Sequence, residues 1–182
     1  RAFRGRRLDD CLRQVERWLG AALPADFQRR LQERTFARFE RELEPVTGVD
    51  EALERIRAES DCRLCVASGG EPEKIRLSLR LTGLDRHFDD ALFSALEVNR
   101  GKPAPDLFLH AARRMGARPG ACVVVEDADS GIEAARAAGM GVIAYRPAGD
   151  AAPPSGVTRL DRMNALPALL DASGDGRRAP VC

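Results

Sequence analysis

The 182 residues are enough to form a buried core, and the 29 basic and 28 acidic side chains almost cancel. This balance predicts neither nucleic-acid binding nor attachment to an anionic membrane surface, and no apolar run approaches the roughly 20 residues of a membrane span. Five scattered cysteines, an odd number, and the lack of a signal-peptide pattern favour a reduced, soluble, cytoplasmic protein. Any anion that it binds is expected to be small and held locally.

The first 44 residues predict a helical unit. Apolar residues recur every three or four positions over 8–19, which is typical of an amphipathic helix. A second such pattern begins at Pro24, a residue suited to the first turn of a helix. We interpret residues 1–44 as a helical domain, residues 45–171 as a second domain and residues 172–182 as a disordered tail.

From residue 45 onward, short apolar runs alternate with helical patterns. Strands are predicted over 64–67, 122–125 and 142–145, with a shorter apolar piece near 91–93. Helices are predicted from Val49 and Pro72, after Pro105, and over 130–138 and 163–170. Such alternation predicts an α/β fold with a Rossmann-like parallel sheet that is covered by helices on both faces, and ligands bind such sheets at the carboxyl ends of the strands.

Three kinds of polar group lie at these strand ends or in the loops beyond them. Ser68 follows one strand, Glu126 and Asp127 follow another, and Lys102 lies in a loop between them. A hydroxyl can donate to a phosphoryl oxygen, an ammonium can neutralise its charge, and two carboxylates can hold Mg²⁺. Unit negative charges about 4 Å apart repel by roughly 4 kcal/mol at an effective dielectric of about 20, a cost that a divalent cation would reverse.

Each of these residues also has a plainer interpretation. Ser68 begins a Ser-Gly-Gly sequence that is ordinary in turns, and the acidic residues after the strand could be solvated while Asp129 caps the next helix. We assign Asp129 to that cap. Lys102 could be a simple loop cation. However, all except two of the 29 basic residues are arginine, so a lysine at this position is informative. The compact charge of an ammonium suits contact with a phosphoryl oxygen, which favours a phosphate-binding role for Lys102.

Three sequence strings together resemble the second, third and fourth motifs of the haloacid dehalogenase superfamily. They are Val-Ala-Ser-Gly-Gly over 66–70, Gly-Lys-Pro-Ala-Pro-Asp-Leu-Phe over 101–108, and Val-Val-Glu-Asp-Ala-Asp-Ser-Gly-Ile-Glu-Ala-Ala over 124–135. They occur in the order of that family, and the similarity runs from about Phe3 to Pro147. Any one motif is weak, whereas the ordered set in matching strand and helix context is specific.

The resemblance implies a role for each candidate residue. Ser68, with Gly69, would bind and orient the phosphoryl group of the substrate. Lys102 would be the catalytic cation that stabilises the nucleophile and the transferring phosphate. Asp127, together with Glu126, would bind Mg²⁺, the expected cofactor.

The helical domain is similar to the cap of the β-phosphoglucomutase-like branch of the family. By that resemblance the two helices are part of a cap that closes over the active site, and Arg4 and Arg7 would reach the substrate. The alternative for Arg4 and Arg7 is a solvated basic turn in the Phe-Arg-Gly-Arg-Arg sequence over 3–7.

The first motif of the family, Asp-x-Asp on a strand before the cap, is not found in these 182 residues. By resemblance that strand is central in the sheet and carries the nucleophilic aspartate, so these 182 residues alone are expected to lack the first strand and to be inactive. Asp127 and Asp129 have the same spacing, but their place after the fourth-motif strand argues against the nucleophile role.

The resemblance implies a Mg²⁺-dependent phosphatase that acts on a small phosphorylated metabolite, such as a sugar phosphate, through an aspartyl-phosphate. The sequence looks closest to the 6-phosphogluconate phosphatase-like branch. Two alternatives stay open, namely a β-phosphoglucomutase-like phosphoryl transferase and a non-catalytic protein that keeps the fold for binding. A monomer or weak dimer is expected, with neither nucleic acid nor membrane as a partner.

Overall fold

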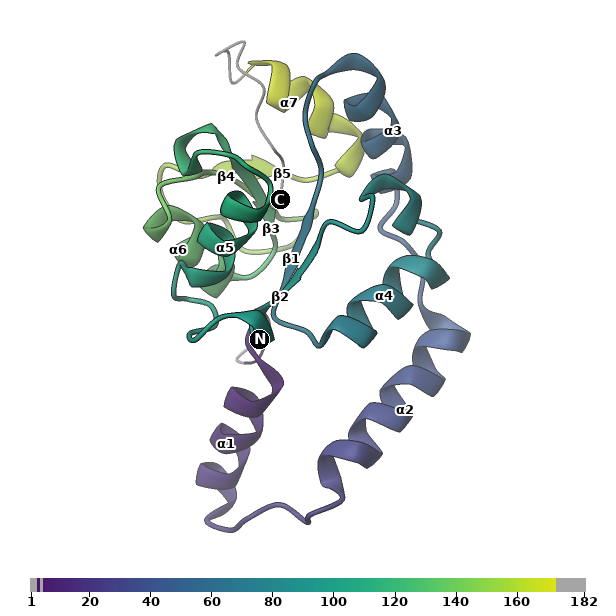
Figure 1. Cartoon of the computed structure of the whole chain (residues 1–182), viewed down its shortest axis with the longest axis vertical. Coiled ribbons are helices and arrows are strands. Elements are labelled where there is room, and N and C mark those ends of the chain that lie inside the picture. The colour runs from purple at the N-terminus through teal and green to yellow at the C-terminus, as the bar shows by residue number, and fades with distance from the viewer. Residues whose placement is uncertain (1–2, 4, 173–182) are drawn as a thin grey trace.

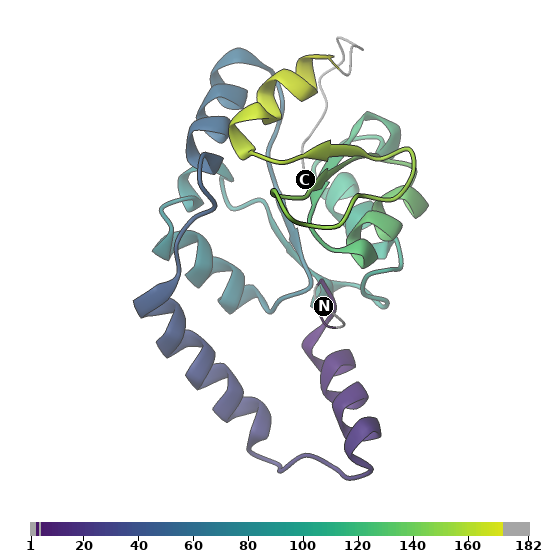
Figure 2. The same cartoon turned by 180° about the vertical axis from the view of Figure 1, so that it is seen from behind.

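A computed structural model describes residue 3 and residues 5–172, and shows two helices that extend from an α/β core (Figures 1 and 2). The helices are α1 (Leu8–Leu19), α2 (Phe27–Glu42), α3 (Val49–Glu59), α4 (Pro72–Leu81), α5 (Asp106–Arg114), α6 (Asp129–Ala137) and α7 (Leu166–Ala172). The strands are β1 (Val66–Ser68), β2 (Leu92–Ser94), β3 (Val123–Glu126), β4 (Gly141–Tyr145) and β5 (Thr158–Leu160).

The strands form two parallel sheets, which confirms the predicted α/β class. In the first sheet β1 pairs with β2, and in the second β4 lies between β3 and β5. No strand among residues 5–172 joins β1 to β3, so the two sheets are separate ladders. This is the place at which the family resemblance puts the first strand.

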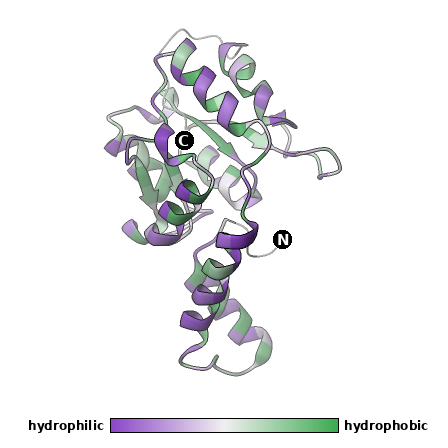
Figure 3. Cartoon of the chain, turned by 90° about the vertical axis from the view of Figure 1, so that its right-hand side faces the viewer, coloured by the Kyte–Doolittle hydropathy of each residue, from purple (hydrophilic) through white to green (hydrophobic). Residues whose placement is uncertain are grey.

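Helices cover both faces of the larger sheet. Ile56 of α3 and Leu166 of α7 are buried on one face with Ile143 of β4, while Phe108 of α5 is buried on the other face with Val124 of β3. Successive side chains of a strand point to opposite faces, so β3 contributes to both clusters. Each fully buried aliphatic or Phe side chain stabilises the fold by about 1.5–3 kcal/mol. Figure 3 shows that the strands are hydrophobic and that most helices have one hydrophobic and one hydrophilic side.

The two N-terminal helices leave the core at separate places, come closer together away from it, and are joined by a loop at the far end (Figure 1). Helix α1 covers the predicted range 8–19 and is followed by Gly20 at a φ of 67°. Helix α2 begins at Phe27 and not at Pro24, because the Pro24 carbonyl first closes a turn with the Phe27 amide (2.9 Å). An apolar cavity of about 680 Å³ lies between α1, α2 and the core, so the side chains of the two helices do not pack fully against each other.

Strand β5 was not predicted from the sequence. It has three residues at the edge of its sheet, and only Leu160 of the three is buried, so it lacks the apolar run by which the other strands were found. The predicted tail lies outside the described residues, except Ala172, which ends α7. None of the helices in the described part of the chain has the length and apolarity that crossing a bilayer requires.

Candidate active site

The carboxyl ends of β1 and β3 open into one cavity of about 460 Å³. Five of the predicted site residues line it, namely Ser68, Gly69, Lys102, Glu126 and Asp127. Ser68 ends β1 and Gly69 follows it, Glu126 ends β3 and Asp127 follows it, and Lys102 reaches in from the loop before α5. The structure therefore brings together the hydroxyl, the ammonium and the acidic pair that the sequence placed at separate strand ends.

Lys102 links the two sheets. Its buried ammonium, Nζ, donates to Glu126 Oε2 (2.5 Å) and to the carbonyl oxygen of Ala67 on β1 (3.3 Å). It also lies 4.8 Å from the centroid of the Phe108 ring, whose negative face attracts a cation. Taking an ammonium out of water costs several kcal/mol, and these partners offset that cost.

Glu126 is held on both of its carboxylate oxygens. While Oε2 accepts from Lys102, Oε1 accepts from the backbone amides of Asp127 (3.1 Å) and Ala128 (3.0 Å). Burial raises the pKa of the Glu126 carboxyl, but the Lys102 charge and the amide of Ala128 outweigh burial and lower this pKa below its usual range. Glu126 is thus an ionised partner that fixes Lys102, and its predicted bond to Mg²⁺ stays a prediction.

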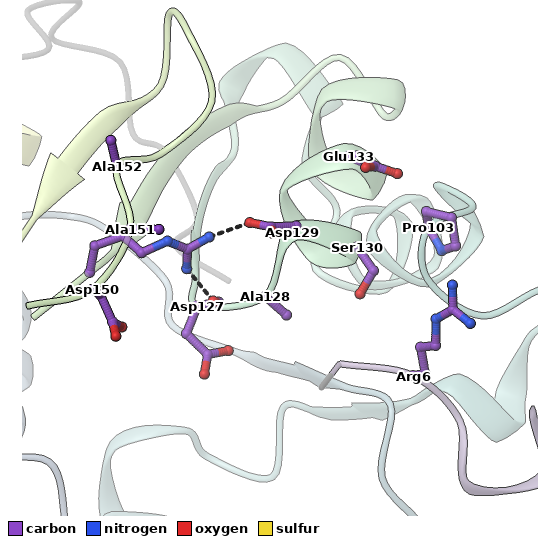
Figure 4. Close-up of a pocket in the computed structure, with 11 residues that line it drawn as sticks. Arg6, Pro103, Asp127, Ala128, Asp129, Ser130, Glu133, Asp150, Ala151 and Ala152 are labelled. Atoms are coloured by element: carbon purple, nitrogen blue, oxygen red, sulfur yellow. Dashed lines mark hydrogen bonds and ion pairs between the residues drawn. The ribbon is translucent and has the colours of Figure 1, made fainter. Parts of the chain in front are cut away.

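Asp127 presents an exposed carboxylate to the cavity. In Figure 4 this carboxylate points away from the side chain of Asp129. Mg²⁺ in proteins is commonly bound by one or two carboxylates plus substrate phosphate and several waters. No group of three or more His, Cys, Asp or Glu among the described residues could hold a metal ion. The residues present therefore fit a partly hydrated Mg²⁺ on Asp127, and do not form a complete protein cage.

The loop after β1 is shaped to approach the N-terminal segment closely. Ser68 Oγ accepts from the Gly70 amide (3.1 Å), and the Gly70 carbonyl accepts from Ser94 Oγ (2.7 Å). A Cβ atom at Gly69 would lie 2.8 Å from the carbonyl oxygen of Gly5. Only glycine therefore lets the entry to α1 pass over this loop and cover the cavity beside Ser68.

Arg7 has other partners than the predicted substrate. Its Nη2 donates to the carbonyls of Ala95 and Val98, and Nη1 donates to the carbonyl of Asn99 (3.2 Å). Arg7 does not line the cavity that contains Ser68, so its contact with substrate stays a prediction. In the structure Arg7 ties the start of α1 to the loop that leads to Lys102. Arg4 lies outside the described residues.

The predicted cap role of Asp129 is wrong. Asp129 is the first residue of α6, the helix has no side-chain cap bond, and the Asp129 carboxylate pairs with Nη2 of Arg146. Sequence analysis missed Arg146, which also donates to the Asp127 carbonyl. The signal was present, because Arg146 directly follows the apolar strand β4, as Ser68 ends β1 and Asp127 follows β3.

Gly131→Ala is expected to destabilise the full-length protein by about 1–3 kcal/mol through overpacking. A Cβ at position 131 would lie 2.1 Å from Cδ and Oε2 of Glu126, which Lys102 and two amides hold in place. The gain of up to about 1 kcal/mol in helix propensity does not compensate for this. The check is urea denaturation beside Gly120→Ala, whose new Cβ meets nothing within 4 Å. Equal stability of the two variants would contradict the described packing of Glu126.

Known proteins are similar to this chain over most of its length. The haloacid dehalogenase-like hydrolases match residues 4–139. The fructose-1-phosphate phosphatase YqaB of Escherichia coli (strain K12) is 49% identical over 83 residues, which cover 46% of this chain and 44% of that protein. The 6-phosphogluconate phosphatase of the same strain is 32% identical over 138 residues, 75% of this chain and 61% of that protein.

A solved structure agrees with these matches. A haloacid dehalogenase family hydrolase from Deinococcus radiodurans R1, crystallised with bound phosphate and sodium, is 30% identical to this chain with a TM-score of 0.71. The match covers 94% of this chain and 78% of that one. The chain spans less than two thirds of the two curated relatives, yet the family match covers most of its own residues. The chain therefore belongs to the haloacid dehalogenase-like hydrolases.

Proposed function

We propose that this chain is part of a Mg²⁺-dependent phosphatase that hydrolyses a small phosphorylated metabolite, most simply a sugar phosphate. The observation that carries the proposal is the single cavity into which Ser68, Lys102 and Asp127 open. The two curated relatives are named for phosphatase activity on fructose 1-phosphate and 6-phosphogluconate, which supports a sugar phosphate as the substrate.

The cavity residues would divide the work of phosphoryl transfer. Lys102, kept in place by Glu126, would neutralise charge on the transferring phosphoryl group, and Ser68 would donate a hydrogen bond to one of its oxygens. Asp127 would hold the Mg²⁺, which when bound supplies further neutralisation of the phosphoryl oxygens. The proposal includes an aspartate nucleophile from the first motif of the family, outside these 182 residues. Its carboxylate would attack the phosphorus, the bond from phosphorus to the sugar oxygen would break so that the sugar leaves as an alcohol, and water would then hydrolyse the aspartyl-phosphate to free phosphate and the aspartate.

The first test is phosphate release by the full-length protein from a panel of sugar phosphates, with Mg²⁺ and with EDTA. We expect phosphate release from at least one sugar phosphate with Mg²⁺, and loss of release in EDTA that returns when Mg²⁺ is restored. Conversion of glucose 1-phosphate without net phosphate release would favour the phosphoryl transferase. Binding of sugar phosphate without any turnover would favour a non-catalytic protein.

A further inference from the structure

Arg146 is a buried cation outside the cavity that contains Ser68. It directly follows β4, and only 7% of its side chain is exposed. Buried arginines require partners, since an unpaired buried charge is very costly. Here Nη1 donates to the carbonyl of Asp127 and Nη2 to the carboxylate of Asp129, as the dashed lines in Figure 4 show. Two residues of the turn after β3 are thus held by one guanidinium.

The sheet fixes the base of the Arg146 side chain. The register of β3 and β4 places Glu126 opposite Ala144, so Arg146 lies two residues beyond this pair. The backbone amide of Arg146 donates to the carbonyl of Leu160 at the end of β5 (2.8 Å). With its backbone held from β5, the guanidinium extends in the other direction, over the end of β3.

The peptide groups on both sides of Asp127 are therefore held by buried charges of opposite sign. Its amide donates to Glu126 Oε1 (3.1 Å), and its carbonyl accepts from Arg146. With both peptide groups fixed, the direction in which the Asp127 side chain leaves the backbone is fixed as well. Displacements of about 1 Å in a catalytic group can cost about 10²-fold in rate, so this restraint matters for a metal ligand.

We propose that Arg146 is a positioning residue that aims the Asp127 carboxylate at the metal site, an inference that rests on the proposed function. Arg146 does not line the cavity with Ser68 and Lys102, so it acts through Asp127 and does not contact the phosphate. It lines a neighbouring cavity of about 280 Å³, which Asp127 and Asp129 also line. A planar guanidinium offers five donors and can hold a carbonyl and a carboxylate together, whereas a lysine ammonium at this position would reach only one of them well.

The test compares Mg²⁺ binding by the full-length wild-type protein and the Arg146→Met and Arg146→Lys variants, with isothermal titration calorimetry. Residues that orient a metal ligand typically contribute about 10- to 100-fold to metal affinity, so we expect Arg146→Met to weaken Mg²⁺ binding by at least about tenfold. The Mg²⁺ affinity of Arg146→Lys should lie between that of Arg146→Met and that of the wild type. In turnover assays, the Mg²⁺ concentration for half-maximal rate should rise more than the KM for the sugar phosphate, which a general loss of structure would not produce.

Arg159→Met is the matched control. Arg159 is exposed nearby and also donates to a backbone carbonyl, that of Pro147 (3.1 Å), but it has no contact with the turn after β3. This variant should bind Mg²⁺ as the wild type does. Addition of guanidinium ion to Arg146→Ala should restore part of the lost Mg²⁺ affinity, because the small cation can occupy the vacated position between Asp127 and Asp129.

Wild-type Mg²⁺ affinity in a folded Arg146→Met variant would overturn the positioning role while leaving the proposed function intact. If Arg146→Met does not fold, Arg146→Lys replaces it in the test, and wild-type Mg²⁺ affinity in Arg146→Lys would likewise overturn the positioning role. Failure of the wild-type protein itself to bind Mg²⁺ would overturn both this inference and the proposed function. Folding of the variants is checked by circular dichroism and by thermal denaturation.

Discussion

Lys102→Met is expected to reduce phosphate release by the full-length protein by a factor of about 10³, because it removes the cation that we propose faces the transferring phosphoryl group. The same change leaves Glu126 buried without its charged partner. Breaking a buried ion pair from one side typically costs about 3–5 kcal/mol of unfolding free energy. Activity is measured as phosphate release, and stability by urea denaturation at neutral pH.

The pH dependence of stability should change sign in Lys102→Met. In the wild type the pKa of Glu126 is lowered, so its contribution to stability is present above the unfolded-state pKa and is lost as the pH falls through the folded-state pKa. Without Lys102, burial should raise the pKa of Glu126 above its unfolded-state value. The variant should then be more stable in acid than near neutrality, where Glu126 must carry an unpaired charge.

A double variant separates packing from chemistry. Lys102→Met with Glu126→Gln removes both charges, so it should recover much of the lost stability without recovering phosphate release. Lys74→Met is the control, because Lys74 is an exposed lysine over the Phe39 ring and its loss should cost only about 0.5–1 kcal/mol. Near-normal phosphate release in Lys102→Met would remove Lys102 from the proposed site.

Asp127→Asn is expected to lower Mg²⁺-dependent phosphate release by about 10³-fold while changing the unfolding free energy by less than about 0.5 kcal/mol. The amide keeps the size of the side chain but loses the charge that is proposed to attract Mg²⁺, and the exposed position means that the change should cost little folding free energy. The measurements are phosphate release against Mg²⁺ concentration and urea denaturation. Large loss of activity with unchanged stability is the signature of a metal ligand.

Glu133→Gln provides the matched control for Asp127→Asn. Glu133 is an exposed carboxylate on α6 that shares the neighbouring cavity with Asp127 but does not line the one with Ser68. Its neutralisation should leave phosphate release and its Mg²⁺ dependence unchanged. Equal losses in the two variants would mean that general negative charge, and not a specific ligand, explains the effect.

The position of the site could be predicted from the sequence because strand ends have a defined location. A buried apolar run such as residues 122–125 predicts a central parallel strand, and the polar residues after it must emerge at the carboxyl edge. The same reasoning holds for Ser68 at the end of β1. Two strand ends of a parallel α/β fold share one edge, so Ser68 and Asp127 had to lie near each other.

The pairing of the charges could not be predicted, because it depends on loop paths that no local pattern encodes. Lys102 meets Glu126 across 24 residues, and Arg7 meets the carbonyls of the loop before Lys102 across about 90 residues. Asp129 looked like a helix cap because capping is a local property, whereas its ion pair with Arg146 depends on the register of two strands. Tertiary contacts decided the partner in each case.

The most direct measurement is a crystal structure of the full-length protein with Mg²⁺ and phosphate. We expect one Mg²⁺ about 2.0–2.1 Å from a carboxylate oxygen of Asp127, and phosphate oxygens within about 3 Å of Lys102 Nζ and Ser68 Oγ. Well-ordered Mg²⁺ and phosphate at another place in the protein, with only water in this cavity, would contradict the proposed site.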